Sequence, residues 1–180
     1  MARSEEVAGV MSPRLVLGVI GAIVGADAFT KWLAVEHLTP AYVPHPVIGE
    51  AIRLTLVYNP GAAFGLHLGP WSRWIFTALT IVALGMMWHL YRTAPAGARW
   101  RVTALTLVSA GALGNLIDRL RSSRGVVDFM DIGVGEWRWP TFNIADMAVS
   151  VGAILLAIVL WHEDTVRARA ERDASASDSA

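Results

Sequence analysis

Hydrophobic residues gather in four long stretches of this chain, separated by shorter and more polar segments. The stretches cover approximately residues 15–35, 71–91, 102–120 and 144–161. A helix needs about 20 mainly apolar residues to cross the hydrocarbon core of a bilayer, and all four stretches come close to that length. The pattern therefore predicts four membrane-spanning helices.

The eight tryptophans mark the ends of these stretches. Those near the C-terminal ends are Trp32, Trp88 and Trp161, those near the starts are Trp71, Trp74 and Trp100, and Trp137 and Trp139 precede the fourth stretch. Such placement is typical of the aromatic belts at membrane–water interfaces. A soluble core also holds tryptophans, but it would not place them at every boundary, so the placement favours a membrane protein.

The first stretch has some features of a secretory signal peptide, because Arg3 and Arg14 precede it. However, Asp27 and Lys31 interrupt it, and no small-residue cleavage site follows it, so we expect a retained span. The polar residues 1–13 and 163–180 are expected to be disordered tails. Residues 14–162 then form one four-helix membrane domain.

Two segments between the spans have the pattern of β-strands. In residues 51–66, "AIRLTLVYNPGAAFGL", larger apolar residues alternate with other residues until Pro60 and Gly61 break the pattern. Residues 125–140, "GVVDFMDIGVGEWRWP", indicate two short strands around Gly133 and Gly135. We expect a small sheet on the outer membrane surface, with an irregular loop carrying apolar anchors as the alternative.

Composition and charge narrow the class further. The 180 residues are 54% hydrophobic and 17% charged, on the apolar side of a typical soluble domain. Fifteen basic and fifteen acidic residues give no net charge, so nothing indicates a nucleic-acid partner. The absence of cysteine excludes disulfides, thiolate metal sites and a cysteine nucleophile.

The arginines indicate how the spans are oriented. With four spans, both termini and the loop between the second and third spans share one side, which carries eight arginines against six on the other. The positive-inside rule then predicts, by a modest margin, that the termini and the loop at residues 92–100 are cytoplasmic.

The polar residues in and beside the apolar stretches all fall near one membrane face. They are Asp27 and Lys31 in the first stretch, Asn115 and Asp118 at the end of the third, Asp128 in the loop that follows, and Asn143 and Asp146 at the start of the fourth, with residues 59–65 on the same side. Spacings of three or four place each pair on one helix face. Each pair alone favours a structural contact between helices, but their convergence predicts a functional site.

Carboxylates are the best candidates for chemistry at this site. The sequence has no G-x-S-x-G or H-E-x-x-H motif, and its five histidines are scattered, so we predict neither a serine nucleophile nor a metal site. Two aspartates brought together would share one proton near neutral pH. The ionised one could take a proton from water while the protonated one hydrogen-bonds a scissile carbonyl. Asp128 and Asp146 are the best candidates for such aspartyl peptide hydrolysis.

Five segments carry a family resemblance. They are DAFTK (27–31), YNPGAAFG (58–65), GNLIDR (114–119), VVDF (126–129) and FNIAD (142–146). In this order they resemble the motifs of lipoprotein signal peptidase, also called signal peptidase II, over about residues 14–162. The resemblance implies an all-α membrane protein of four transmembrane helices with a small extracytoplasmic β-cradle. It also implies an intramembrane aspartyl endopeptidase of the bacterial cytoplasmic (inner) membrane, with its active site on the extracytoplasmic side.

In that family, the enzyme removes the signal peptide from diacylglyceryl-modified prolipoproteins by cleaving before the lipidated cysteine. The resemblance implies that Asp128 and Asp146 are catalytic. It implies that the substrate site is lined by Asn59, Gly61, Phe64, Asn115, Arg119 and Asn143, and that Asp27, Lys31 and Asp118 support it. The partners implied are the lipid-modified prolipoprotein and membrane lipid, with no cofactor and an expected monomer. Ala28 and Pro60 depart from the family's usual glutamine and threonine.

Two expectations about geometry follow. The carboxyl groups of Asp128 and Asp146 should lie roughly 3–6 Å apart, within reach of one water or of each other. Asp118 should pair with an arginine or cap the end of the third span. Two other classes remain as alternatives. A coupled transporter would show repeated halves and midplane carboxylates, both missing here, and an anchoring protein would need no carboxylate pair.

Overall fold

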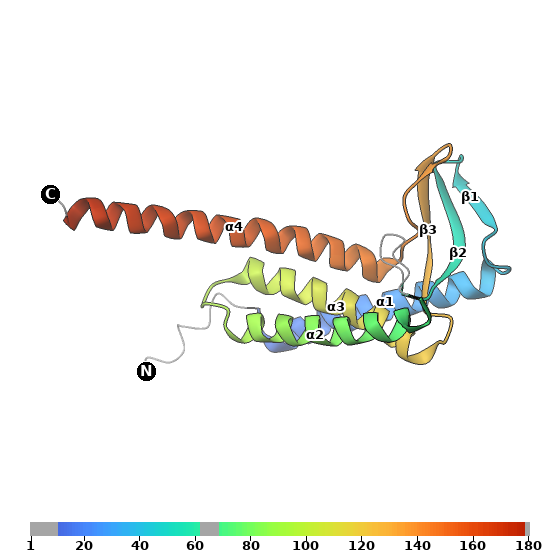
Figure 1. Ribbon diagram of the computed structural model, residues 1–180, viewed down its shortest axis with the longest axis horizontal. Coiled ribbons are helices and arrows are strands. Elements are labelled where there is room, and N and C mark those ends of the chain that lie inside the picture. The colour runs from blue at the N-terminus through green and yellow to red at the C-terminus, as the bar shows by residue number, and fades with distance from the viewer. Residues whose placement is uncertain (1–10, 62–68, 179–180) are drawn as a thin grey trace.

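The computed structural model describes residues 11–61 and 69–178. Four long helices run along the bundle, and a small sheet stands at one end of it (Figure 1). The helices are α1 (Pro13–His37), α2 (Ser72–Arg92), α3 (Arg99–Arg121) and α4 (Ile144–Asp178), and a short 3₁₀ turn, η1 (Gly69–Trp71), precedes α2. Residues 1–10 of the expected N-terminal tail and Phe64 lie outside the described residues.

All four predicted spans are helical, and each helix is long and apolar enough to cross a membrane. The start of α1 shows how local sequence sets such a boundary. Pro13, whose fixed φ suits a first helical turn, opens the helix, and the Ser12 hydroxyl accepts a hydrogen bond of 3.3 Å from the backbone N–H of Leu15. The helix therefore begins two residues before the apolar stretch.

The expected disorder of residues 163–180 is wrong for the described part, because α4 continues to Asp178. The residues after Trp161 include many alanines, arginines and glutamates, which are strong helix formers, and no glycine or proline interrupts them. The helix therefore runs on past the apolar stretch and projects beyond the other three (Figure 1).

The helices keep most of their apolar surface on the outside of the bundle. Only 6% of the most apolar part of α2 is buried, whereas the share for α3 is 44%, since α3 packs against all three other helices. Trp71, Trp88 and Trp161 are 69%, 60% and 76% exposed near helix ends. Such a surface would be unfavourable in water and is suited to lipid. The described residues form a multi-pass membrane protein.

The sheet has four antiparallel strands in the order β1-β2-β3-β4. They are β1 (Pro44–Ile48), β2 (Ile52–Asn59), β3 (Val126–Val134) and β4 (Trp137–Arg138). The predicted strands correspond to β2, β3 and β4. Strand β1 was missed because Pro44 and Pro46 argue against a strand; a proline is tolerated at a sheet edge, where β1 lies.

A small apolar core joins the sheet to the end of α1. Ala34 and Leu38 of α1 pack with Leu56 of β2 and Phe129 of β3, and all four are buried. Since Val57 is the register partner of Asp128, this packing also fixes where Asp128 stands relative to the helices. The core therefore positions one of the two candidate aspartates.

An ion-pair network around Asp131 connects strands β2, β3 and β4. Asp131 on β3 accepts hydrogen bonds from Arg138 of β4 at 2.6 and 2.8 Å and from Arg53 of β2 at 3.0 Å. The Thr55 hydroxyl donates to the same carboxylate at 3.0 Å. Burial alone would raise the pKa of Asp131, but the hydrogen bonds outweigh burial and lower it. The network ties three strands together and stabilises the ionised carboxylate.

Candidate active site

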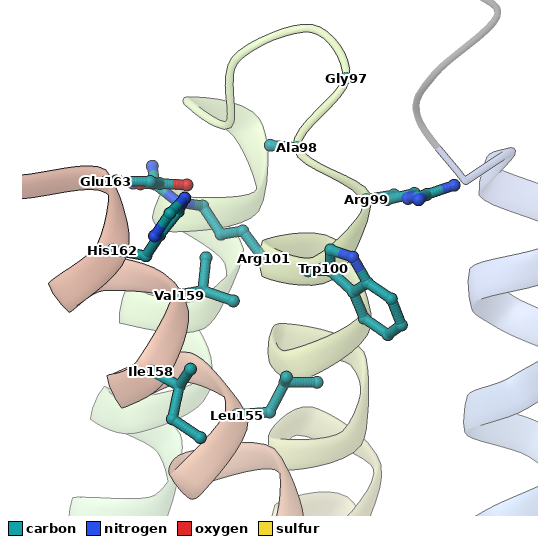
Figure 2. A pocket seen from close by; sticks show the side chains of 10 residues that line it. All are labelled: Gly97, Ala98, Arg99, Trp100, Arg101, Leu155, Ile158, Val159, His162 and Glu163. Carbon is teal, nitrogen blue, oxygen red and sulfur yellow. The ribbon is translucent and has the colours of Figure 1, made fainter. Parts of the chain in front are cut away.

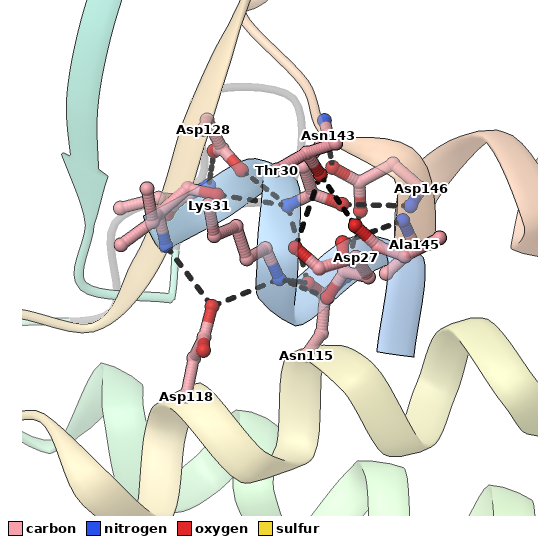
Figure 3. Close-up of polar contacts among 12 residues, drawn as sticks. Asp27, Thr30, Lys31, Asn115, Asp118, Asp128, Asn143, Ala145 and Asp146 are labelled. Carbon is pink, nitrogen blue, oxygen red and sulfur yellow. Dashed lines mark hydrogen bonds and ion pairs between the residues drawn. The ribbon is translucent and has the colours of Figure 1, made fainter. Parts of the chain in front are cut away.

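The polar residues singled out in the sequence meet at the end of the bundle that carries the sheet (Figure 3). They are Asp27 and Lys31 on α1, Asn59 on β2, Asn115 and Asp118 on α3, Asp128 on β3, and Asn143 and Asp146 at the start of α4. The contacts span long stretches of sequence: the backbone N–H of Ala145 donates to Oδ1 of Asp27, 118 positions earlier, at 2.9 Å.

Asp146 is held by the start of α4. Asn143 directly precedes the helix, and its Oδ1 accepts a hydrogen bond of 2.9 Å from the backbone N–H of Asp146. In return, Oδ2 of Asp146 accepts one of 3.1 Å from the backbone N–H of Asn143. This reciprocal arrangement is a capping box, and it places the carboxylate at the positive end of the helix dipole. The side chain is only half-buried, so a second molecule could reach it.

Asp128 is almost completely buried, with 2% exposure. Its Oδ2 accepts a hydrogen bond of 3.1 Å from Asn59 and its Oδ1 one of 2.7 Å from Asn143. Burial, and then the nearby charge of Asp146, raise the pKa of Asp128 to about 7. The hydrogen bonds from the two asparagines oppose this rise without cancelling it. The raised pKa favours the protonated form of this carboxyl group near neutral pH.

Asn143 joins the two aspartates. Its side-chain amide donates to Asp128, and its backbone N–H donates to Asp146. The side chain is fully buried, and it also donates to Oδ1 of Asn115 at 3.2 Å. Asn115 in turn donates through Nδ2 to Oδ1 of Asp146 at 2.7 Å. Both carboxyl groups therefore belong to one hydrogen-bond network, although the carboxyl separation of roughly 3–6 Å remains a prediction.

Lys31, the sole lysine of the sequence, joins this network to two further carboxylates. The Lys31 side chain is 4% exposed, and its ammonium group contacts Oδ2 of Asp27 at 2.7 Å, Oδ2 of Asp118 at 2.8 Å and Oδ1 of Asn115 at 3.0 Å. Three acceptors use all three of its N–H donors. The predicted pairing of Asp27 with Lys31 is confirmed.

Asp118 pairs with no arginine among the described residues, so that part of the expectation was wrong. Its Oδ2 contacts Lys31 and accepts a hydrogen bond of 3.2 Å from the backbone N–H of Val127. Arg119, the arginine next to it in the sequence, points elsewhere because consecutive residues on a helix do not face one another. Asp118 therefore links α1, α3 and the start of β3.

Two glycines of α3 allow α1 and α4 to pack closely against its backbone. A Cβ atom on Gly114 would lie 2.7 Å from Oδ2 of Asp27 and 3.1 Å from Cβ of Ala145. A Cβ atom on Gly111 would lie 2.2 Å from the backbone oxygen of Ala145. Without side chains at these positions, α4 and α1 reach the α3 backbone, as small residues allow in membrane helix pairs.

Gly61 holds Asn59 in the orientation in which Asn59 donates a hydrogen bond to Asp128. The backbone N–H of Gly61 donates to Oδ1 of Asn59 at 3.1 Å, and this orients the Nδ2 of Asn59 toward Asp128. Gly61 has φ of +114°, and a Cβ atom there would lie 2.9 Å from the ring of Phe76. A side chain at position 61 would therefore be strained and would disturb this orientation.

Arg119 is placed near the aspartates without a hydrogen bond to either. Its guanidinium carbon lies 5.9 Å from the centre of the Phe76 ring, and its Nε is buried with no hydrogen-bond partner among the described residues. The charges of Asp146, Asp128 and Asp118 all act on it. Arg119 therefore places a positive charge near the two carboxylates.

Reasoning from sequence missed the contacts made by backbone and by glycine. The amides of Ala145 and Val127 hold Asp27 and Asp118, and an amide group carries no sequence signal. The small residues of α3 did carry one, because Ala110 and Gly114 are four apart in an apolar helix, a spacing that favours close helix packing. Among residues 11–61 and 69–178, no cluster of three or more His, Asp or Glu side chains is placed to hold a metal ion.

The sequence matches a known protein family and its members. Residues 19–162 match the family described as Signal peptidase (SPase) II. The chain is 40% identical over 153 residues to a lipoprotein signal peptidase of Nitratidesulfovibrio vulgaris (strain DP4), a match covering 83% of this chain and 91% of that protein. It is also 40% identical over 159 residues to one from Cupriavidus taiwanensis, covering 87% of this chain and 88% of that protein.

Two solved structures share the fold. Both are bacterial membrane enzymes determined by the in meso method. One superposes with a TM-score of 0.76 at 28% identity and covers 87% of this chain and 93% of its own. The other has a TM-score of 0.73 at 29% identity and covers 84% and 96%.

The spanning helices, the sheet and the carboxylate cluster thus define a multi-pass membrane enzyme. Because the family match covers most of the sequence, the chain belongs to the signal peptidase II family, the lipoprotein signal peptidases. Membership of this family makes it a peptidase. The predicted family and the predicted fold class are both confirmed.

Proposed function

We propose that this protein is an aspartyl endopeptidase that removes the signal peptide from diacylglyceryl-modified prolipoproteins, cleaving before the lipidated cysteine. The observation that carries the proposal is that one residue, Asn143, donates hydrogen bonds to both Asp128 and Asp146. Family membership supports the class of substrate, and the two carboxyl groups that share one hydrogen-bond network support the mechanism.

In this mechanism Asp146 is the base and Asp128 is the acid. Asp146 takes a proton from a water molecule as the water oxygen bonds to the scissile carbonyl carbon. Asp128 donates its proton to the carbonyl oxygen, which gives a neutral tetrahedral diol. The C–N bond then breaks as the amine nitrogen takes the proton from Asp146, and Asp128 recovers its own proton from the diol. The pKa of about 7 for Asp128 supports its role as the protonated partner.

Substrate contacts are proposed for the residues around the pair. The guanidinium group of Arg119, whose charge lies near the two aspartates, is proposed to contact a backbone carbonyl of the substrate. Asn59 and Asn115 line the approach and donate hydrogen bonds to the carboxyl groups. Gly61 lines it beside Asn59, to which its backbone N–H donates, and the family resemblance adds Phe64. Asp27, Lys31 and Asp118 have a supporting role, because Lys31 contacts both carboxylates and orients Asn115.

The proposed setting is the bacterial cytoplasmic membrane, with the aspartates on the extracytoplasmic side and a monomer as the working unit. The arginine excess on the side of the termini favours this orientation. It also suits a substrate whose lipid anchor holds the scissile bond at the outer surface. A reporter fused after Trp161 should be active only in the cytoplasm, and activity only outside would reverse the orientation.

The test is cleavage of a lipidated prolipoprotein by purified variants. Asp128→Asn and Asp146→Asn should each lower turnover by at least about a hundredfold, the lower range for lost acid–base catalysis. Asp118→Asn is the matched control, because it makes the same chemical change in the same cluster at a residue assigned only a supporting role. We expect it to reduce turnover partially.

Normal cleavage by a folded Asp146→Asn variant would contradict the proposal. Complete loss of turnover in a stably folded Asp118→Asn variant would show that the acid–base pair is misassigned. A substrate without the diacylglyceryl group distinguishes this activity from general proteolysis, since only the lipidated form should be cut.

A further inference from the structure

A groove lies at the end of the bundle away from the sheet, where the proposed peptidase chemistry has no part. It consists of two adjoining cavities of about 540 and 560 Å³, which share Gly97, Ala98, Arg101 and Glu163. We call it the α3–α4 groove, because the start of α3 and the middle of α4 form its walls (Figure 2).

One part of the groove is apolar. Leu155, Ile158 and Val159 line it from α4, and Trp100 lines it from α3. Figure 2 shows the three aliphatic side chains following one another along α4, below the charged residues. Ile158 is 57% exposed, so this wall is open to the surroundings of the helix. A hydrocarbon chain could lie along it without leaving the membrane.

The other part of the groove is cationic. Arg99, Arg101 and Arg167 line the two cavities together with one acidic residue, Glu163, which leaves a net charge of about +2. Arg101 reaches across from α3 and pairs with Glu163 (Figure 2). Its Nε is nevertheless buried without a hydrogen-bond partner among the described residues. The groove therefore carries a positive charge that attracts an anion.

The position of the groove decides which anion can reach it. Here α3 begins at Arg99, whose guanidinium lies 5.7 Å from the centre of the Trp100 ring, and the apolar part of α4 ends near Trp161. Exposed tryptophans and arginines at the ends of spans mark the headgroup level of a bilayer. The apolar wall then lies at the depth of the acyl chains.

We propose that the α3–α4 groove binds an anionic phospholipid, with the phosphate-bearing headgroup at the arginines and an acyl chain along Leu155, Ile158 and Val159. A zwitterionic lipid would fill the apolar wall equally well but would gain less from the net positive charge. A soluble anion would gain from the charge but would leave the apolar wall unfilled. The combination favours an anionic lipid over both.

The test is lipid binding by the full-length protein in detergent, measured by native mass spectrometry with phosphatidylglycerol and with phosphatidylcholine. The wild-type protein should bind phosphatidylglycerol at least about fivefold more tightly, as expected for a basic site at a membrane surface. The double variant Arg99→Gln/Arg167→Gln should lose this preference. The matched control Arg92→Gln/Arg169→Gln removes two arginines at the same end that line neither cavity, and it should keep the preference within about twofold.

A second variant tests the apolar wall. Ile158→Trp fills that wall at an exposed position, so the protein should fold, and it should weaken binding of both lipids. Equal affinity of the wild-type protein for the two lipids would overturn the proposal. So would an equal loss of preference in the control pair, because the effect would then come from general surface charge. Lipid binding needs no cleavage assay, so this result stands apart from the proposed peptidase activity.

Discussion

The ammonium group of Lys31 lies 3.0 Å from Oδ1 of Asn115, although the two residues are 84 positions apart. This hydrogen bond fixes which end of the Asn115 amide faces which neighbour. With its oxygen turned to Lys31, the amide presents Nδ2 to Asp146 at 2.7 Å. A buried charge on α1 therefore orients a hydrogen-bond donor to a proposed catalytic residue on α4.

Replacing Lys31 by methionine should reduce both stability and turnover. The carboxylates of Asp27 and Asp118 would lose their cation in a buried site, which costs about 3–5 kcal/mol when one partner of a buried pair is removed. Asn115 would lose the contact that orients it, so kcat should fall more than KM rises. Thermal unfolding and steady-state kinetics on the lipidated substrate measure the two effects.

Lys31→Arg is the informative companion variant. It keeps the positive charge but replaces three N–H bonds from one nitrogen with a planar fork. We expect it to recover part of the stability while kcat remains low. Full recovery of kcat would mean that Lys31 supplies charge alone and does not orient Asn115.

Turnover should depend on pH through Asp128. As the proposed acid, Asp128 must hold its proton, and its pKa of about 7 means that the proton is lost as the pH rises past neutral. We expect kcat/KM to decrease above about pH 7, by up to tenfold per pH unit. A kcat/KM that rises steadily from pH 7 to 9 would exclude Asp128 as the acid.

Gly114→Ala should disrupt the site by separating the helices. The added methyl group would meet Oδ2 of Asp27 at 2.7 Å in a buried cluster that has no room to adjust. We expect a loss of about 1–3 kcal/mol in stability and a clear fall in turnover. The control is Gly85→Ala on α2, where nothing lies within 4 Å of the new atom. Equal effects of the two substitutions would contradict the packing argument.

Asp131→Asn should weaken the sheet in a pH-dependent way. The lowered pKa of Asp131 means that its contribution to stability is present above the unfolded-state pKa of about 3.9 and is lost as the pH falls through the lower folded-state value. At pH 7 the variant should therefore be less stable by about 2 kcal/mol and should have a lower Tm, and the gap from wild type should narrow as the pH falls below the unfolded-state pKa. Asp164→Asn, at an exposed position of α4, should show no such gap.

Several features of this protein follow from the sequence alone because their causes are local. The four spans come from runs of apolar residues, and the aromatic belts come from tryptophans at their ends. The pairing of Asp27 with Lys31 follows from their spacing of four on one helix. Strand β2 follows from alternation, whereas β1 escaped prediction because its prolines are tolerated only at a sheet edge, a position that depends on the other strands.

Only the tertiary structure decided how the polar residues meet. Asn115 and Asn143 have two chemically different ends, and which end faces an aspartate depends on neighbours contributed by other helices. The pKa of Asp128 depends on how deeply the packing of β3 buries it and on the distance to the charge of Asp146. Gly114 sets the approach of α1 and α4. Spacing along one chain segment does not encode these contacts, since each depends on the packing of helices and strands distant in sequence.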